Sequence, residues 1–162
     1  MSKMFGIELS MIWAAIIAFA VIAYVVLDGF DLGVGILFGL YHDTHDRQRM
    51  MNSVAPVWDG NETWLVLGGG GLFAAFPAAY GLVMSSLYAP IICMLLALAF
   101  RGVAFEFVHQ TKNYRKLWEW SFFGGSSLAA FCQGMVLGAI VQGIVVEGRG
   151  YAGGWWDWIT PS

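Results

Sequence analysis

The sequence predicts an all-α membrane protein, a bundle of four transmembrane helices. Of its 162 residues, 59% are hydrophobic and only 12% are charged, whereas soluble domains are about half apolar and a quarter charged. The mean hydropathy is +0.67, and several apolar runs reach the roughly 20 residues that a helix needs to cross a bilayer. No strand-like alternation persists, and a backbone in lipid must satisfy its own hydrogen bonds, which favours helices.

The first helix is expected over about residues 9–40. Met11 to Leu27 carries no charge, and the apolar character continues past Asp28 and Asp31. Only Lys3 precedes this run and no small-residue cleavage site follows it, so we expect a retained anchor instead of a cleaved signal peptide.

The second and third helices are expected over about residues 54–77 and 80–103, because the stretch from Thr63 to Phe100 has no charge and is long enough for two spans. Pro77 and Gly81 would form a tight turn between them. Ser53 is the expected N-cap of the second helix. The fourth helix is expected over about residues 120–146.

The basic residues of the connections predict the orientation. They are Arg47 and Arg49 in the first connection and Lys112, Arg115 and Lys116 in the third. The positive-inside rule places both connections in the cytoplasm and the N-terminus outside. The net charge of −3 and the lack of a basic stripe argue against nucleic acid as a partner.

Two pairs of carboxylates need an explanation, because a charge at the bilayer centre costs about 2.5–3.5 kcal/mol on insertion scales. Asp28 and Asp31 share a helix face, either as interfacial groups that cap or bond neighbouring helices or as part of a proton or ion pathway. Asp59 and Glu62 have the same spacing, either as charges that complement a helix N-terminus or as proton-uptake groups.

The residues around the second pair favour neither interpretation alone. Trp58, Asn61 and Trp64 accompany Asp59 and Glu62, and the tryptophans are expected to restrict water around Asp59. Arg101 and Glu106 follow the long uncharged stretch. They either snorkel to the cytoplasmic surface or pair with the Asp59 group across helices.

The glycine run Gly68, Gly69, Gly70 and Gly71 is expected at a close helix contact, within this chain or with another one. No Lys-Ser/Thr follows it, so it does not suggest a phosphate-binding loop. No metal or haem ligand is expected among the histidines and methionines. We expect the histidines to be solvated in loops and the methionines to be packing residues. They are His42, His45, His109, Met84, Met94 and Met135.

Three motifs resemble subunit II of the cytochrome bd-type quinol oxidases, including the cyanide-insensitive branch. They are "LDGFDLGVGILF" (Leu27 to Phe38), "NSVAPVWDGNETWLVLGGGGLFAAFP" (Asn52 to Pro77) and "RGVAFEF" (Arg101 to Phe107). The resemblance covers about residues 11–146. This chain is about half the length that the family implies, so it would correspond to the N-terminal half of an eight-helix subunit.

The resemblance implies a complex in a prokaryotic cytoplasmic membrane that oxidises quinol, reduces dioxygen to water and generates a proton gradient. Subunit I would carry haem b and haem d, and subunit II would bind no haem by its own side chains. Asp59 would take part in proton uptake from the cytoplasm, and Trp64 would lie on an oxygen route from the lipid. The residues alone leave two alternatives, half of a repeat-built secondary transporter and a purely structural membrane partner.

Overall fold

The structure is a computed structural model that describes residues 3–4, 7–111, 113–144, 146–147 and 150–151. The described residues form six helices, α1 (Leu9–Phe38), α2 (Thr44–Val54), α3 (Trp58–Ala75), α4 (Pro77–Ser86), α5 (Tyr88–Gln110) and α6 (Arg115–Gln142). Two antiparallel pairs of two-residue strands flank them, β1 (Lys3–Met4) with β2 (Ile7–Glu8) and β3 (Val146–Glu147) with β4 (Gly150–Tyr151). The prediction of a helical protein is confirmed. Of the residues used for the orientation, Lys112 lies outside the described ones.

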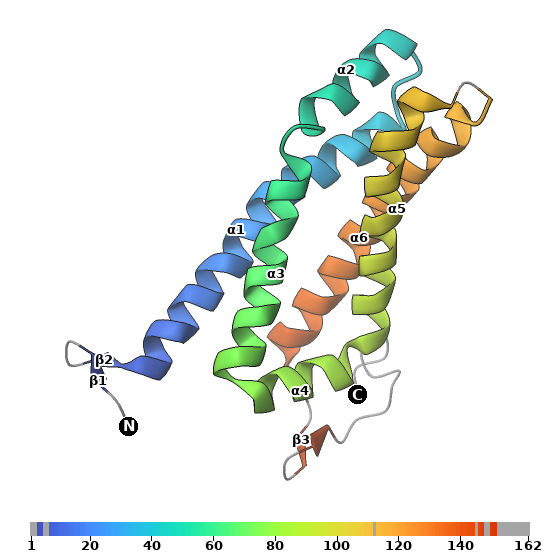
Figure 1. Cartoon of the computed structure of the whole chain (residues 1–162). Helices are drawn as coiled ribbons and strands as arrows, with labels where there is room; N and C mark the ends of the chain where they lie inside the picture. Colours follow the sequence, from blue (N-terminus) through green and yellow to red (C-terminus); the bar gives the residue numbers. More distant parts are fainter. Residues whose placement is uncertain (1–2, 5–6, 112, 145, 148–149, 152–162) are drawn as a thin grey trace.

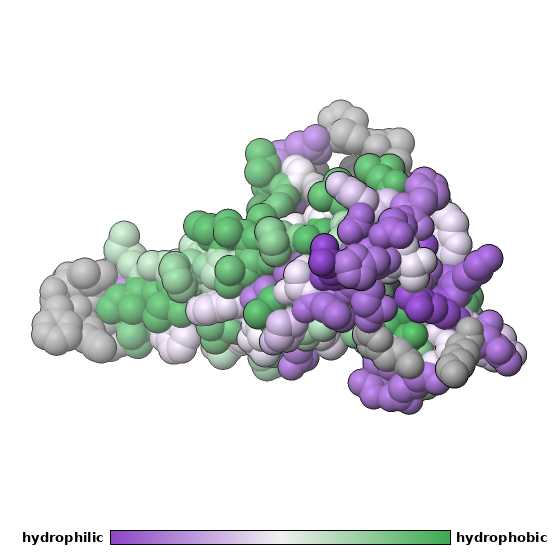
Figure 2. Space-filling view, turned by 90° about the horizontal axis from the view of Figure 1, so that it is seen from above, coloured by the Kyte–Doolittle hydropathy of each residue, from purple (hydrophilic) through white to green (hydrophobic). Residues whose placement is uncertain are grey.

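Four helices run along the length of the bundle, and two short helices lie at its ends (Figure 1). α5 packs along α6, and α1 packs against both α3 and α6. α2 lies at one end, and α4 crosses the other end between α3 and α5. Viewed onto the end that carries α2, hydrophilic side chains gather there, and hydrophobic side chains cover the projecting part of α1 (Figure 2).

Among the described residues, three helices have the length and hydropathy to cross a membrane, α1, α5 over Tyr88–Val108, and α6. The predicted count of four is therefore not confirmed. α3 has 18 residues but begins with a polar turn that contains Asp59, Asn61 and Glu62. Its apolar part alone is shorter than the roughly 20 residues of a typical span.

The segment before α3 corrects two expectations. Residues 44–54 form the amphipathic helix α2, which the sequence analysis treated as part of a loop. Asp43 caps it, accepting a hydrogen bond from the Asp46 N–H at 3.3 Å. Ser53 lies in the last turn of α2 and donates to the Met50 carbonyl at 2.7 Å. It is therefore not the N-cap of the next helix, which begins only at Trp58 after Val57.

The expected tight turn at Pro77 is wrong as well. Pro77 begins α4, because a proline fits the first helical turn, where its missing N–H costs no hydrogen bond. The chain bends at Phe76, and the next long helix runs over 88–110 instead of 80–103. α6 begins five residues earlier than expected and ends before Gly143, whose φ of 93° favours glycine.

The core consists of two apolar clusters stacked along α5. One contains Leu32, Met94, Ala97, Leu98, Ala129 and Cys132. The other contains Phe38, Met51, Val54, Ala104, Val108 and Phe122. The buried residue of α5 that lies between these two clusters is Arg101. The bundle interior thus has a polar layer between two apolar ones.

Candidate functional site

Arg101 is the centre of a buried charge cluster that joins three helices. Its side chain is 0% exposed, and its Nη1 donates to Asp28 Oδ1 at 3.1 Å and to Glu62 Oε1 at 3.2 Å. Its Nη2 lies 3.9 Å from Asp31 Oδ2. Of the two expectations for Arg101, pairing across helices is confirmed and snorkelling to the surface is wrong.

Asp28 and Asp31 lie inside the bundle, with both side chains 0% exposed. Asn61 on α3 donates to Asp31 Oδ2 at 2.7 Å. The two aspartates thus bond groups on neighbouring helices, as one interpretation expected, but in the interior and not at an exposed interface. Their spacing of three residues on α1 points both towards the same neighbours.

The cluster holds three carboxylates against one guanidinium. Neighbouring carboxylates repel each other, and protonation of one relieves that repulsion. Within this cluster, three buried polar atoms lack a hydrogen-bond partner among the described residues, Asp31 Oδ1 and the Nε and Nη2 of Arg101. A site with excess carboxylate and free hydrogen-bonding capacity can hold and pass protons.

Two further residues of this cluster were not predicted from the sequence. Gln133 on α6 donates through Nε2 to Asp28 Oδ2 at 3.3 Å and to the Tyr24 hydroxyl on α1. Gln133 interrupts an otherwise apolar stretch of α6, and that interruption was the available signal. Tyr24 gave none, because a tyrosine in an apolar helix is common.

Glu62 connects the cluster to the surface. Its side chain is 23% exposed, and it shares Nη1 of Arg101 with the fully buried Asp28. Asp59, three residues before it in the first turn of α3, is exposed. The structure thus places an exposed, a partly exposed and a fully buried carboxylate in succession, in Asp59, Glu62 and Asp28.

The tryptophans do not enclose Asp59 as expected. Trp58 stacks on Phe105 with ring centroids 5.3 Å apart, and a Cβ on Gly102 would lie 2.9 Å from its ring. Trp64 forms an edge contact with Phe19 at 5.7 Å. The helical period turns both rings towards neighbouring helices and leaves Asp59 exposed.

Glu106 does not contact the charge cluster, and two of the four glycines of the run do not contact α1. Glu106 is exposed and accepts a hydrogen bond from Gln110 on its own helix at 2.5 Å. A Cβ on Gly68 or Gly71 would meet α1, at 3.3 Å from Val21 or 3.2 Å from Ile17, whereas one on Gly69 or Gly70 would meet nothing within 4 Å in the part of the chain that the structure describes. The helix contact within this chain thus needs only Gly68 and Gly71.

A second ionic cluster fixes α2 and was not predicted. Glu119 on α6 binds Arg47 of α2 at 2.9 Å and Arg115 of its own helix at 2.9 Å. Arg115 also donates to Gln48 at 3.3 Å. The four-residue spacing of Arg115 and Glu119 was a usable signal. These contacts attach the connection that carries Arg47 to the end of α6.

One group of metal-ligand type occurs among the described residues. Oxygen or nitrogen atoms of Asp43, His45 and Asp46 lie within 4.8 Å of one another beside α2. His45 and Asp43 are exposed, and the carboxylate of Asp43 serves as the helix cap. This capping accounts for the proximity of Asp43 and Asp46.

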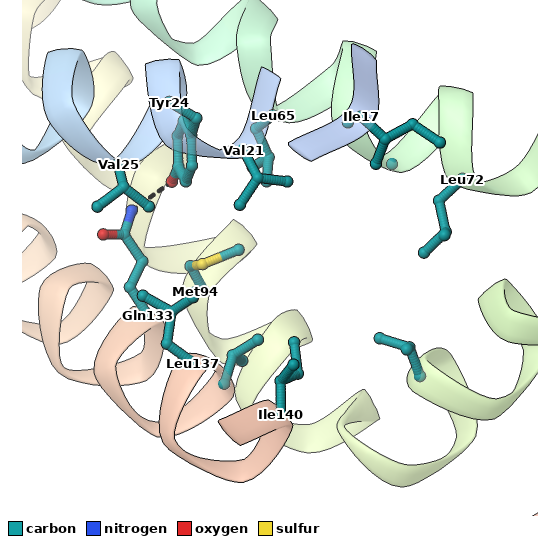
Figure 3. Close-up of a pocket in the computed structure, with 14 residues that line it drawn as sticks. Ile17, Val21, Tyr24, Val25, Leu65, Leu72, Met94, Gln133, Leu137 and Ile140 are labelled. Carbon is teal, nitrogen blue, oxygen red and sulfur yellow. Dashed lines mark hydrogen bonds between the residues drawn. The ribbon is translucent and has the colours of Figure 1, made fainter. Parts of the chain in front are cut away.

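An apolar cavity of about 180 Å³ lies next to the charge cluster. Its lining includes Ile17, Val21, Leu65, Gly69, Leu72, Met94 and Leu137. Tyr24 and Gln133 point towards each other at its edge (Figure 3). Gln133 thus lines this cavity and also bonds Asp28 of the charge cluster.

Comparisons with known proteins agree with the resemblance. Residues 9–162 match the sequence model of a family described as cytochrome bd terminal oxidase subunit II. The chain is 40% identical over 141 residues to cytochrome bd-I ubiquinol oxidase subunit 2 of Escherichia coli K12, across 84% of this chain and 37% of that protein. It is 37% identical over 139 residues to cytochrome bd ubiquinol oxidase subunit 2 of Bacillus subtilis, across 84% and 41%. The chain thus spans well under half the length of these relatives.

Proposed function

Because this chain belongs to the cytochrome bd terminal oxidase subunit II family, we propose that it is part of a membrane complex that oxidises quinol and reduces dioxygen to water. Three helices with the composition of membrane spans and the names of the relatives support this proposal. The location is the cytoplasmic membrane of a prokaryote. The observation that carries the proton part of the proposal is the buried Arg101 cluster with its link to the surface through Glu62.

In this proposal the haems belong to the partner. Haem b and haem d, which supply the electron transfer and the oxygen chemistry, would be carried by subunit I, which would also oxidise the quinol. The interior of the described bundle offers carboxylates, a guanidinium, an amide and a phenol around Arg101, which suit protons better than haem iron. His42 and His45 are exposed beside α2.

Proton uptake is the task that we assign to this chain. Reduction of dioxygen to water consumes protons. Asp59 would collect them at the exposed first turn of α3, Glu62 would pass them inward, and Asp28 and Asp31 would hold them around Arg101. The succession of exposed, partly exposed and buried carboxylates supports this order. The same end of the bundle carries Arg47 and Arg115, whose positive charges favour the cytoplasmic side.

Further assignments follow from the same proposal. α3, at 18 residues, is about 27 Å long and would be the fourth span beside α1, with the N-terminus outside. Trp64, packed on Phe19 of α1, would lie on the oxygen route from the lipid. Gly69 and Gly70, where an added Cβ would meet nothing within 4 Å among the described residues, would contact the partner. The remaining helices of an eight-helix subunit would complete the assembly.

The reduced-minus-oxidised absorption spectrum of the complex purified through this chain tests the proposal. We expect bands of haem b and haem d, and quinol-dependent oxygen consumption in the same preparation. A complex without haem would overturn the oxidase proposal and favour a transporter. Haem and activity that persist after this chain is removed from the complex would reduce the chain to a structural attachment.

A further inference from the structure

Among the described residues of α6, Gln133 is the one that hydrogen-bonds to the Arg101 cluster. It is partly buried, and its Nε2 donates to Asp28 Oδ2 and to the Tyr24 hydroxyl. Tyr24 is 4% exposed and shares the Gln133 amide with Asp28. Figure 3 shows the Gln133 amide and the Tyr24 hydroxyl facing each other at the edge of the apolar cavity.

This arrangement fixes the carboxylate of Asp28 from two sides. Arg101 on α5 donates a hydrogen bond to Asp28 Oδ1 at 3.1 Å, and Gln133 on α6 donates one to Asp28 Oδ2 at 3.3 Å. Without Gln133, Asp28 Oδ2 would lose this hydrogen bond inside the bundle. A buried carboxylate oxygen without a donor costs free energy, so the carboxylate would turn towards the donors that remain.

The orientation of Asp28 affects Glu62, because both accept from the same atom, Nη1 of Arg101. A rotation of Asp28 towards Arg101 would draw this nitrogen away from Glu62. The charged and titratable groups around Asp28 are Arg101 on α5, Glu62 on α3, and Asp31 and Tyr24 on α1. Gln133 on α6 is an uncharged hydrogen-bond donor to Asp28, opposite the charged donor Arg101.

We propose that Gln133 is a positioning residue for proton transfer: supported by Tyr24, it holds Asp28 so that Arg101 is shared between Asp28 and Glu62. This inference rests on the proposed function, because the transfer it serves is the proton uptake of the oxidase. Gln133 itself does not carry a proton in this role. It acts through the geometry of Asp28.

The test uses the purified complex with Gln133→Met, which keeps most of the volume but removes the donor. Gln142→Met is the matched control, since Gln142 lies on the same helix with an exposed side chain. We expect Gln133→Met to slow turnover per haem by about tenfold or more and to change the pH dependence of turnover. Gln142→Met should match the unmodified complex in both. Tyr24→Phe, which removes the support, should change the pH dependence in the same direction, and it replaces Gln133→Met if that complex does not assemble.

A second readout does not depend on oxidase activity. Infrared difference spectra with Asp28→Asn identify the bands of Asp28. We expect Gln133→Met to shift these bands and Gln142→Met to leave them in place. Unshifted bands and an unchanged pH profile in Gln133→Met and Tyr24→Phe would overturn the role of Gln133. If Asp59→Asn and Glu62→Gln also left turnover unchanged, the proposed proton route itself would be wrong. In that case, a shift of the Asp28 bands in Gln133→Met would show only that Gln133 orients a structural carboxylate.

Discussion

Arg101 on α5 and Asp28 on α1 form an ion pair at 3.1 Å in which neither side chain is exposed. The pair lies between the two apolar clusters of the core and links α1 directly to α5 at this level. Burial of two charges is repaid only when further hydrogen bonds satisfy them. Glu62 and Gln133 supply such bonds from α3 and α6, so all four long helices depend on this one layer.

Loss of Arg101 should therefore destabilise the protein strongly. Arg101→Met leaves Asp28, Asp31 and Glu62 together without their cation, and breaking a buried pair in this way costs about 3–5 kcal/mol. Thermal denaturation of the purified complex should show a large fall in midpoint or no folded complex at all. Arg49→Met, at an exposed position, should leave the midpoint unchanged. Equal midpoints for the two variants would contradict a structural role for the cluster.

A single methyl group at Gly125 should disturb the contact between α5 and α6. A Cβ there would lie 2.7 Å from the Ala97 carbonyl oxygen and 3.2 Å from Arg101 Cβ, so α5 would have to move. We expect Gly125→Ala to lower stability by about 1–3 kcal/mol.

The neighbouring Gly124 gives the control. It is exposed, and a Cβ there would meet nothing within 4 Å. Gly124→Ala should be neutral or slightly stabilising, because alanine is the better helix former. If both substitutions had the same effect on the denaturation midpoint, the close helix approach at Gly125 would be wrong.

Removal of Glu119 should release α2. Glu119→Leu leaves Arg47 and Arg115 without their shared carboxylate, so α2 should open more often and expose its arginines. Limited trypsin digestion of inside-out membrane vesicles should then cut at Arg47 and Arg49 several-fold faster. Glu106→Gln, an exposed change on α5, should digest at the original rate. Slower or equal cleavage in Glu119→Leu would mean that α2 is held by its apolar contacts alone.

The sequence was sufficient to predict the elements whose signal is local. Long apolar runs predicted α1, α5 and α6 as spans, and the rarity of charge in them drew attention to Asp28 and Asp31. α2 was missed because a short amphipathic helix in a basic loop has no membrane-span signal. α4 was missed because Pro77 was interpreted as a break, although a proline equally begins a helix.

The charged members of the candidate site were predictable from the sequence, but the contacts between them were not. Each of Glu62, Arg101 and Asn61 was singled out for its residue type, but the choice of partner for Arg101 depends on distances between separate helices. Gln133 was not predicted, because burying a neutral amide in a membrane helix costs less free energy than burying a charge and is therefore a weaker sign of a functional site. The outward direction of Asp59 depends on the rotation of α3, which Trp58 fixes by stacking on Phe105.

The most direct test of the central claim measures turnover per haem in Asp59→Asn, Glu62→Gln and the double variant. We expect each single change to slow quinol-dependent oxygen consumption by about tenfold or more with the haem content unchanged, because the amide keeps the shape but cannot release a proton. The double variant should be no slower than the slower single one, since both groups serve one route, and Glu106→Gln should behave as the unmodified complex. Full turnover in both single variants, in complexes that retain their haem, would contradict proton uptake through Asp59 and Glu62.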